Sequence, residues 1–466
     1  MKKQIIFLAI ICLASCSIIS AQQSEPSADA SPSLTIYNNN FAVVSLSLRI
    51  SFEQGTNQLK FTDIASAIEP ESVNFKCLSS PGQVSILEQS YEYGLADSAG
   101  LLKQYIDKNI TVALKGSGAD TGKKLSGVLL ALTGGDLILK SQTNDIEIIS
   151  TDSIENISLK ELPGELITRP TLTWLANAKE EGDQTCQITY TTGQIGWNAD
   201  YSAVLNPDET KIDFTGWVTI DNKSGATYKD SFIKLIAGDV RKLAEPRLQK
   251  MELLHARAEA PSNGFEEKPF MEYHVYTLGR KSTINNNQVK QIEFIEPAPG
   301  MLTKKLYIFD RSRENDKIQV KLEFENNKEN NLGIALPKGK VRVFKKNVAD
   351  DSLEFVGEDK IDHTAKQEKV SLYIGNTFDV VPEYTLLDSQ YDRRSTRETH
   401  KIEFQNRKKD EAVTVFVDEK FRPGVNWNIE NSTHKHEKRD ANTARFEVKL
   451  NPDSVVTIQY TATQSW

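Results

Sequence analysis

The chain has little of what membrane spans, zinc sites and nucleic-acid binding surfaces require. Only four of its 466 residues are cysteines and six are histidines. Its one long apolar run, 5–14, has about ten residues, whereas a membrane-spanning helix needs roughly twenty. Asp and Glu outnumber Lys and Arg by 64 to 56, which gives a formal net charge of -8. Nucleic acid is excluded as a partner because phosphate binding needs a basic surface. No metal, cofactor or catalytic residue is predicted.

The first sixteen residues have the order of an export signal. Two lysines and the apolar run lead to Leu13-Ala14-Ser15-Cys16, in which small residues stand directly before a cysteine. This order predicts a secretory signal peptide over 1–21 that includes a lipobox. The Cys16 thiol then carries a diacylglycerol that anchors the protein to a membrane. The alternative is cleavage after Ala21, which releases a soluble product.

The expected location is the cell envelope. Ser17 does not favour retention at an inner membrane, so we expect an outer-membrane lipoprotein, or a periplasmic or secreted protein if cleavage follows Ala21. Residues 22–33 are polar and rich in Ser, Pro and Ala, a composition typical of a flexible tether.

From residue 34 onward, alternating apolar and polar residues predict an all-β, multi-domain protein built from β-sandwiches. We expect an N-terminal β region over 34–98 and a β-sandwich region over 170–394. Within the latter, 241–268 mixes both signs of charge with few strand signals and is predicted to be a mobile excursion. The final stretch, 395–466, has short alternating strands that are typical of an immunoglobulin-like sandwich.

Residues 99–162 form a distinct pattern between these regions. A short amphipathic helix with Leu101, Leu102, Tyr105 and Ile106 precedes five short strand-like runs. This order is typical of a small SH3-like or Sm-like barrel, and its position predicts an insertion in the first β domain.

Two cysteines, Cys77 and Cys186, lie outside the export signal. Each alternates with apolar neighbours along a predicted strand, so both thiols are expected to face an apolar interior. Two interpretations stay open. They are either buried free thiols that act as small hydrophobic groups or a disulfide, which an oxidising envelope permits.

Few side chains point to chemistry. His434 and His436 lie two residues apart beside Glu437, but nearby lysines oppose a cation. His363 could act as a general base paired with Asp362, but a role in organising a turn is the favoured interpretation. A sugar-stacking platform would need exposed aromatic residues, and the candidates are Trp174, Trp197, Tyr201, Trp217, Trp427 and Tyr273. Aromatic residues in a sandwich are more often part of the core, and that is the favoured interpretation. The terminal Trp466 is predicted to end a final sandwich strand.

Six stretches in order carry a resemblance to a known family. They are 197–201 (WNADY), 216–225 (GWVTIDNKSG), 235–240 (LIAGDV), 336–343 (LPKGKVRV), 355–364 (FVGEDKIDHT) and 375–380 (GNTFDV). Over 170–466 the chain resembles the domain of unknown function 4139 family, related to mucoidy-inhibitor-like proteins. The resemblance implies a β-rich secreted or envelope protein and supplies no catalytic residue. The chain has no long heptad region for the coiled coil of the mucoidy-inhibitor group.

Together these patterns predict location better than activity. The expected function is that of an exported, lipid-anchored, non-catalytic envelope protein that binds a protein partner or a surface polymer. The alternative is a carbohydrate-binding or carbohydrate-active periplasmic protein, which would show paired carboxylates or an exposed aromatic strip.

Overall fold

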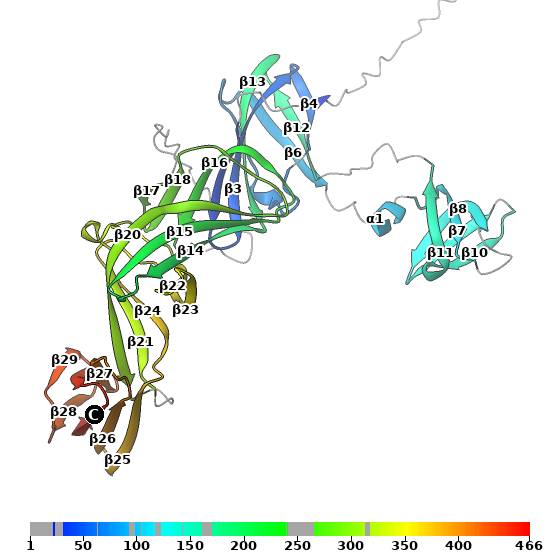
Figure 1. The fold of residues 1–466 in the computed structure, drawn as a ribbon. Coiled ribbons are helices and arrows are strands. Elements are labelled where there is room, and N and C mark those ends of the chain that lie inside the picture. The colour runs from blue at the N-terminus through cyan, green and yellow to red at the C-terminus, as the bar shows by residue number, and fades with distance from the viewer. Residues whose placement is uncertain are drawn as a thin grey trace, which may run out of the picture.

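The computed structural model describes residues 22–23, 31–62, 64–92, 98–103, 105–116, 123–141, 143–160, 170–238, 240, 265–312 and 317–466. Cys16 and the predicted signal lie outside these residues, as do most of the tether and 241–264 of the predicted excursion. The described chain is almost entirely β-strand in several sheets (Figure 1), which confirms the predicted all-β class. None of its helices is long and apolar enough to cross a membrane.

The first unit is formed by strands from both sides of the predicted insertion. It comprises β1 (Gln22–Gln23), β2 (Ser33–Tyr37), β3 (Phe41–Phe52), β4 (Gly55–Phe61), β5 (Asn74–Cys77), β6 (Val84–Glu92), β12 (Thr171–Ala178), β13 (Gly182–Gly193), β16 (Tyr228–Ala237), β17 (Phe265–Phe270), β18 (Tyr273–Leu278) and β19 (Ser282–Ile284). One sheet has the order β1-β4-β12-β6 and the other β17-β18-β16-β2-β3-β13-β5, with β19 beside β16.

This pairing differs from the predicted division of the chain. Strands β3 and β13 pair along their whole lengths, and β2 pairs in parallel with β16. The predicted region 34–98 is therefore not a domain of its own, since its strands find their partners beyond residue 170. Residues 265–268, predicted to end the excursion, belong to β17 and pair with β18.

The chain between β6 and β12 forms a small separate unit (Figure 1). It contains α1 (Ser98–Lys103), β7 (Asn109–Leu114), β8 (Lys124–Thr133), β9 (Asp136–Ser141), β10 (Ile146–Ser150), a 3-10 turn (Thr151–Ser153) and β11 (Ile154–Leu159). The five strands form one antiparallel sheet in the order β10-β9-β8-β7-β11. Tyr105, Val112, Leu129 and Leu137 form a core that belongs to this unit alone.

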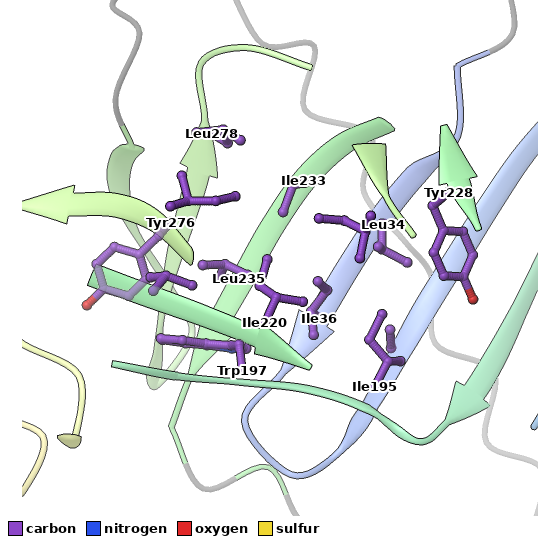
Figure 2. Packing of buried hydrophobic residues seen from close by; sticks show 14 of the residues in the cluster. Leu34, Ile36, Ile195, Trp197, Ile220, Tyr228, Ile233, Leu235, Tyr276 and Leu278 are labelled. Atoms are coloured by element: carbon purple, nitrogen blue, oxygen red, sulfur yellow. The ribbon is translucent and has the colours of Figure 1, made fainter. Parts of the chain in front are cut away.

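The middle unit is a curved set of strands that shares its core with the first unit. It contains β14 (Ile195–Leu205), β15 (Lys211–Asn222), β20 (Gln288–Asp310), β21 (Gln319–Glu325), β22 (Gly339–Lys346), β23 (Leu353–Ile361) and β24 (Lys369–Asn376). Figure 2 shows residues of β2, β16 and β18 meeting those of β14 and β15. Trp197 lies in this core and donates its indole N–H to the Ile236 carbonyl at 3.2 Å.

The last unit is a two-sheet sandwich with a second core. Its strands are the end of β20 with β25 (Val380–Asp392), β26 (Ser395–Asn406), β27 (Val413–Lys420), β28 (Asn426–Glu430), β29 (His436–Asp440), β30 (Thr443–Leu450) and β31 (Ser454–Ser465). Phe309, Phe404, Phe446 and Tyr460 fill the space between the sheets. The predicted boundary at residue 395 falls inside the β25–β26 hairpin, so this unit begins earlier than predicted, because β25 contributes Val380 to the same core.

Candidate functional site

The strands of the middle unit pair in the order β23-β22-β14-β15-β20-β21-β24, and β23 packs against β24, so the set closes into a barrel with a seam between these two strands. At this seam the Tyr373 backbone N–H donates to the Asp359 carboxylate at 2.7 Å. A Cβ added to Gly357 would lie 2.4 Å from the Ile374 carbonyl oxygen. Because only glycine lacks this atom, Gly357 lets the two backbones approach closely. One end of the barrel faces the last unit.

A recess of about 240 Å³ opens at that end. Its floor is apolar, and its rim is charged. The floor residues come from four strands of the barrel and are Leu205, Val320, Leu322, Val356 and Ile374. The rim holds Glu209, Lys305, Lys345 and Lys408, together with Tyr307 and Phe378. Barrel mouths with an apolar lining and a few convergent polar groups are common ligand sites.

The charged rim groups are linked in one alternating series. Glu209 accepts from both Lys305 and Lys345, and Glu411 accepts from Lys305 at 3.5 Å and from Lys408 at 2.7 Å. Three ammonium groups thus alternate with two carboxylates, and both ends of the series are lysines. In a chain of net charge -8, this series carries a local positive excess, although Asp379 also lines the recess and adds a third carboxylate.

The rim carboxylates are held in their charged form. Burial opposes ionisation of Glu209, but hydrogen bonds from Lys305 and Lys345 outweigh it and hold the pKa of Glu209 below its ordinary value. The same balance, with Lys408 as the donor, lowers the pKa of Glu411. A carboxylate that stays ionised and paired is a poor proton donor at neutral pH. These groups are therefore suited to binding rather than to acid catalysis.

Phe378 lies at the edge of the recess with its side chain in solvent. It is 91% exposed, although the loop that carries it is fixed on both sides. Thr377 donates its backbone N–H to the Ile318 carbonyl at 2.9 Å and its hydroxyl to the Val380 carbonyl at 2.5 Å. Single exposed apolar side chains are common on protein surfaces, so Phe378 is of interest because it lies beside the apolar floor of the recess.

A second group of charges lies inside the last unit. The Arg311 guanidinium binds both carboxylate oxygens of Glu419, at 2.6 and 2.5 Å, and Tyr460 donates to the same carboxylate at 2.8 Å. The Glu419 side chain is only 1% exposed. A bidentate pair with a buried carboxylate fixes the geometry of its surroundings.

His400 lies beside this buried pair. Its Nδ1 atom is 3.0 Å from the Tyr384 hydroxyl, and its Nε2 atom is 3.6 Å from the Glu398 carboxylate. Burial, with a further contribution from the positive charge of Arg311, lowers the pKa of His400 to about 4. The imidazole is therefore neutral at pH 7, so it functions as a buried polar group.

The residues proposed from sequence lie far from the recess. Cys77 and Cys186 are free thiols opposite each other on β5 and β13. His363 accepts from the Lys338 backbone N–H at 3.2 Å, as expected of a residue that organises a turn. His436 packs against Phe446, and no cluster of three metal-ligating side chains occurs in the described part of the chain. Trp466 follows β31, which pairs with β26 and β28.

The six aromatic residues considered for a sugar-stacking platform differ in burial. Trp174, Trp197 and Tyr201 are at most 2% exposed because each points into the shared core. Of the other candidates, Trp427 stacks on Phe421 with ring centroids 4.5 Å apart, and Trp217 is 42% exposed. Core positions, the commoner role of aromatic residues in a sandwich, therefore account for Trp174, Trp197 and Tyr201.

Sequence reasoning missed the recess, although a signal for it was present. Three of the stretches that carry the family resemblance, 336–343, 355–364 and 375–380, form β22, β23 and the loop of Phe378. The lysines and glutamates of the rim are scattered over two hundred residues, so only the fold brings them together.

We compared the chain with known protein families and with curated proteins. No protein-family model matches the chain, and no curated protein does. The resemblance to the domain of unknown function 4139 family therefore stays a prediction from the sequence.

Proposed function

We propose that the protein is an exported, non-catalytic component of the cell envelope, anchored through Cys16, and that the recess at the barrel mouth binds a partner protein. The segment that enters would place a carboxylate beside an apolar side chain. The observation that carries this proposal is the rim itself, in which lysines end both sides of the ion-pair series and Phe378 projects next to an apolar floor.

The size of the recess favours a partner protein over a free small molecule. Sites that enclose drug-sized ligands measure roughly 300–1,000 Å³, and this recess measures about 240 Å³. It therefore suits one or two side chains of a larger surface. Lys345 and Lys408 each have a single carboxylate partner, so each ammonium keeps donor capacity for an incoming carboxylate.

Site-specific photocrosslinking in cells tests the binding site. A photoreactive residue at Phe378 is expected to give one discrete crosslinked protein, whereas the same residue at Met271, which is 84% exposed on the first unit, gives none. Lys345→Gln should abolish that product. Lys346→Gln, the next residue on β22, should retain it, because the Lys346 side chain pairs with Asp351 outside the recess. Equal products from Phe378 and Met271, or an unchanged product in Lys345→Gln, would overturn the proposal.

A separate measurement tests the anchor. Cys16→Ala is expected to move the protein from the membrane fraction to the soluble fraction and to prevent incorporation of labelled fatty acid. If the native protein carries no lipid and begins at Gln22, cleavage after Ala21 is the correct alternative.

A further inference from the structure

Cys77 and Cys186 are register partners on the antiparallel strands β5 and β13. The Leu78 N–H donates to the Thr185 carbonyl at 2.8 Å, which joins the residue after one cysteine to the residue before the other. This pattern marks a non-hydrogen-bonded pair, the type in which facing Cα atoms are only about 4.5 Å apart and side chains are closest. Disulfides need Cα separations of about 4.4–6.8 Å, so the backbone already meets that requirement.

Both cysteines are buried in the folded chain, with Cys77 4% and Cys186 0% exposed, but they occupy different positions in the sheet. Cys77 is the last residue of β5, an edge strand, and it is followed by the exposed Ser79. Its sulfur lies 3.6 Å from the Gln184 side-chain oxygen, which also accepts from the Ser79 hydroxyl at 2.5 Å. Cys186 is 0% exposed and lies in the central strand β13. Fraying at the end of β5 therefore exposes Cys77 first.

A cross-link between these two cysteines would join the segments that precede and follow the small unit. The chain that leaves Cys77 forms β6, then the small unit of α1 and β7 to β11, and returns through β12 to Cys186. The two cysteines thus stand at the base of the excursion that carries the small unit. A disulfide between them would attach the short edge strand β5 covalently to β13. It would also enclose β6, the small unit and β12 in one covalent loop.

We propose that Cys77 and Cys186 are a thiol–disulfide exchange site that forms a cross-strand disulfide in the mature protein. The Cys77 thiolate attacks a disulfide of an oxidant, such as a protein dithiol oxidase or glutathione disulfide, and one oxidant thiol leaves. The Cys186 thiolate then attacks the Cys77 sulfur of this mixed disulfide, and the second oxidant thiol leaves. Two protons pass to the leaving thiols, so the oxidant gains the two electrons that the cysteines lose. The oxidising compartment rests on the proposed export, whereas the chemistry of the pair does not.

Thiol trapping tests the proposal in two arms. The full-length protein taken from the envelope is quenched in acid and alkylated under denaturing conditions, and its tryptic peptides are then mapped. We expect one peptide that joins Cys77 to Cys186 and disappears on reduction. In the second arm the purified, reduced protein is exposed to glutathione disulfide. We expect the same link in the monomer, with an unchanged circular dichroism spectrum.

Single variants test the order of attack. Cys186→Ser should accumulate a glutathione adduct on Cys77, and Cys77→Ser should leave Cys186 unmodified over the same time. The reverse preference, or intermolecular dimers as the only oxidised product in the second arm, would overturn the proposal. Free thiols in the envelope sample together with a link in the second arm would instead contradict only an oxidising location, which the Cys16 fractionation measures independently.

Discussion

Two sets of ion pairs lie a short distance apart along β20 and differ in how far their carboxylates are exposed to solvent. At the barrel mouth, the side chains of Lys305, Glu209 and Lys345 are 22–35% exposed. In the last unit, Glu419 is 1% exposed and binds Arg311 through two hydrogen bonds. Water can replace a lost partner in the first set but not in the second.

This difference separates a binding surface from a structural element. A partner can exchange with a half-exposed pair at small cost, because solvent already competes for both charges. A fully buried carboxylate such as Glu419 cannot exchange its partner without leaving an uncompensated charge in an apolar core. We therefore propose that the ion pairs at the barrel mouth bind a partner, whereas the Arg311–Glu419 pair stabilises the fold of the last unit. The following variants test this difference.

The largest effect is expected for Glu419→Gln. The amide keeps a group for Tyr460 to contact but removes the paired charge of Arg311, which is 26% exposed and retains Glu398 at 4.0 Å. The free energy of unfolding should therefore fall by about 3 kcal/mol, the lower end for loss of a buried partner. Denaturant unfolding of the full chain measures this. Glu447→Gln is the matched control, because Glu447 is 53% exposed in a pair with Lys449, and it should change stability little. A loss for Glu419→Gln no larger than that of the control would show that the buried pair is not structural.

Acid should weaken the last unit through His400. Its folded pKa of about 4 lies below the unfolded value, so between pH 6.5 and 4 the unfolded state binds more protons, and stability falls as pH falls through this window. The difference corresponds to up to about 3 kcal/mol. Unfolding measured from pH 7 to pH 4 should show this slope in the native chain, and His400→Gln should remove most of it. An equal slope in that variant would assign the acid sensitivity to other groups.

The sequence predicts what depends on local pattern and misses what depends on distant strands. Alternation along 41–50 and 212–221 was enough to predict strands, which the structure has at Phe41–Phe52 and Lys211–Asn222. Helical spacing over 98–106 predicted the helix that the structure has at Ser98–Lys103. The division into domains failed at residue 395, because a hairpin turn at Arg393 reads like a domain linker. It failed again at 34–98, because pairing of β2 with β16 has no local signal.

The two kinds of ion pair were equally hidden. Glu209 follows a β-strand in a turn, and Glu419 ends a strand beside Lys420, so both look like ordinary surface residues in the sequence. Their burial is decided by partners about one hundred residues away, Lys305 and Arg311. Such pairs become visible only when the register of β20 against its neighbours is known.

The smallest change in stability is expected for Glu209→Gln, and its effect on binding should have the opposite sign. The variant loses two half-exposed pairs, so the free energy of unfolding should fall by about 1 kcal/mol or less. It also releases Lys305 and Lys345 from their shared carboxylate, which increases the positive excess at the rim. We therefore expect a higher yield of the partner crosslinked through Phe378, since a partner carboxylate meets Lys345, which has lost its carboxylate, and Lys305, which keeps only the 3.5 Å contact with Glu411.

Glu358→Gln is the matched control for that variant. Glu358 is 45% exposed and pairs with Lys340 on the same barrel, away from the recess, so its loss should leave the crosslinking yield unchanged. If Glu209→Gln destabilised the chain as much as Glu419→Gln, the rim would be a structural network like the buried pair. If it left the fold intact but lowered the crosslinking yield, Glu209 itself would contact the partner, and the incoming group would be a cation rather than a carboxylate.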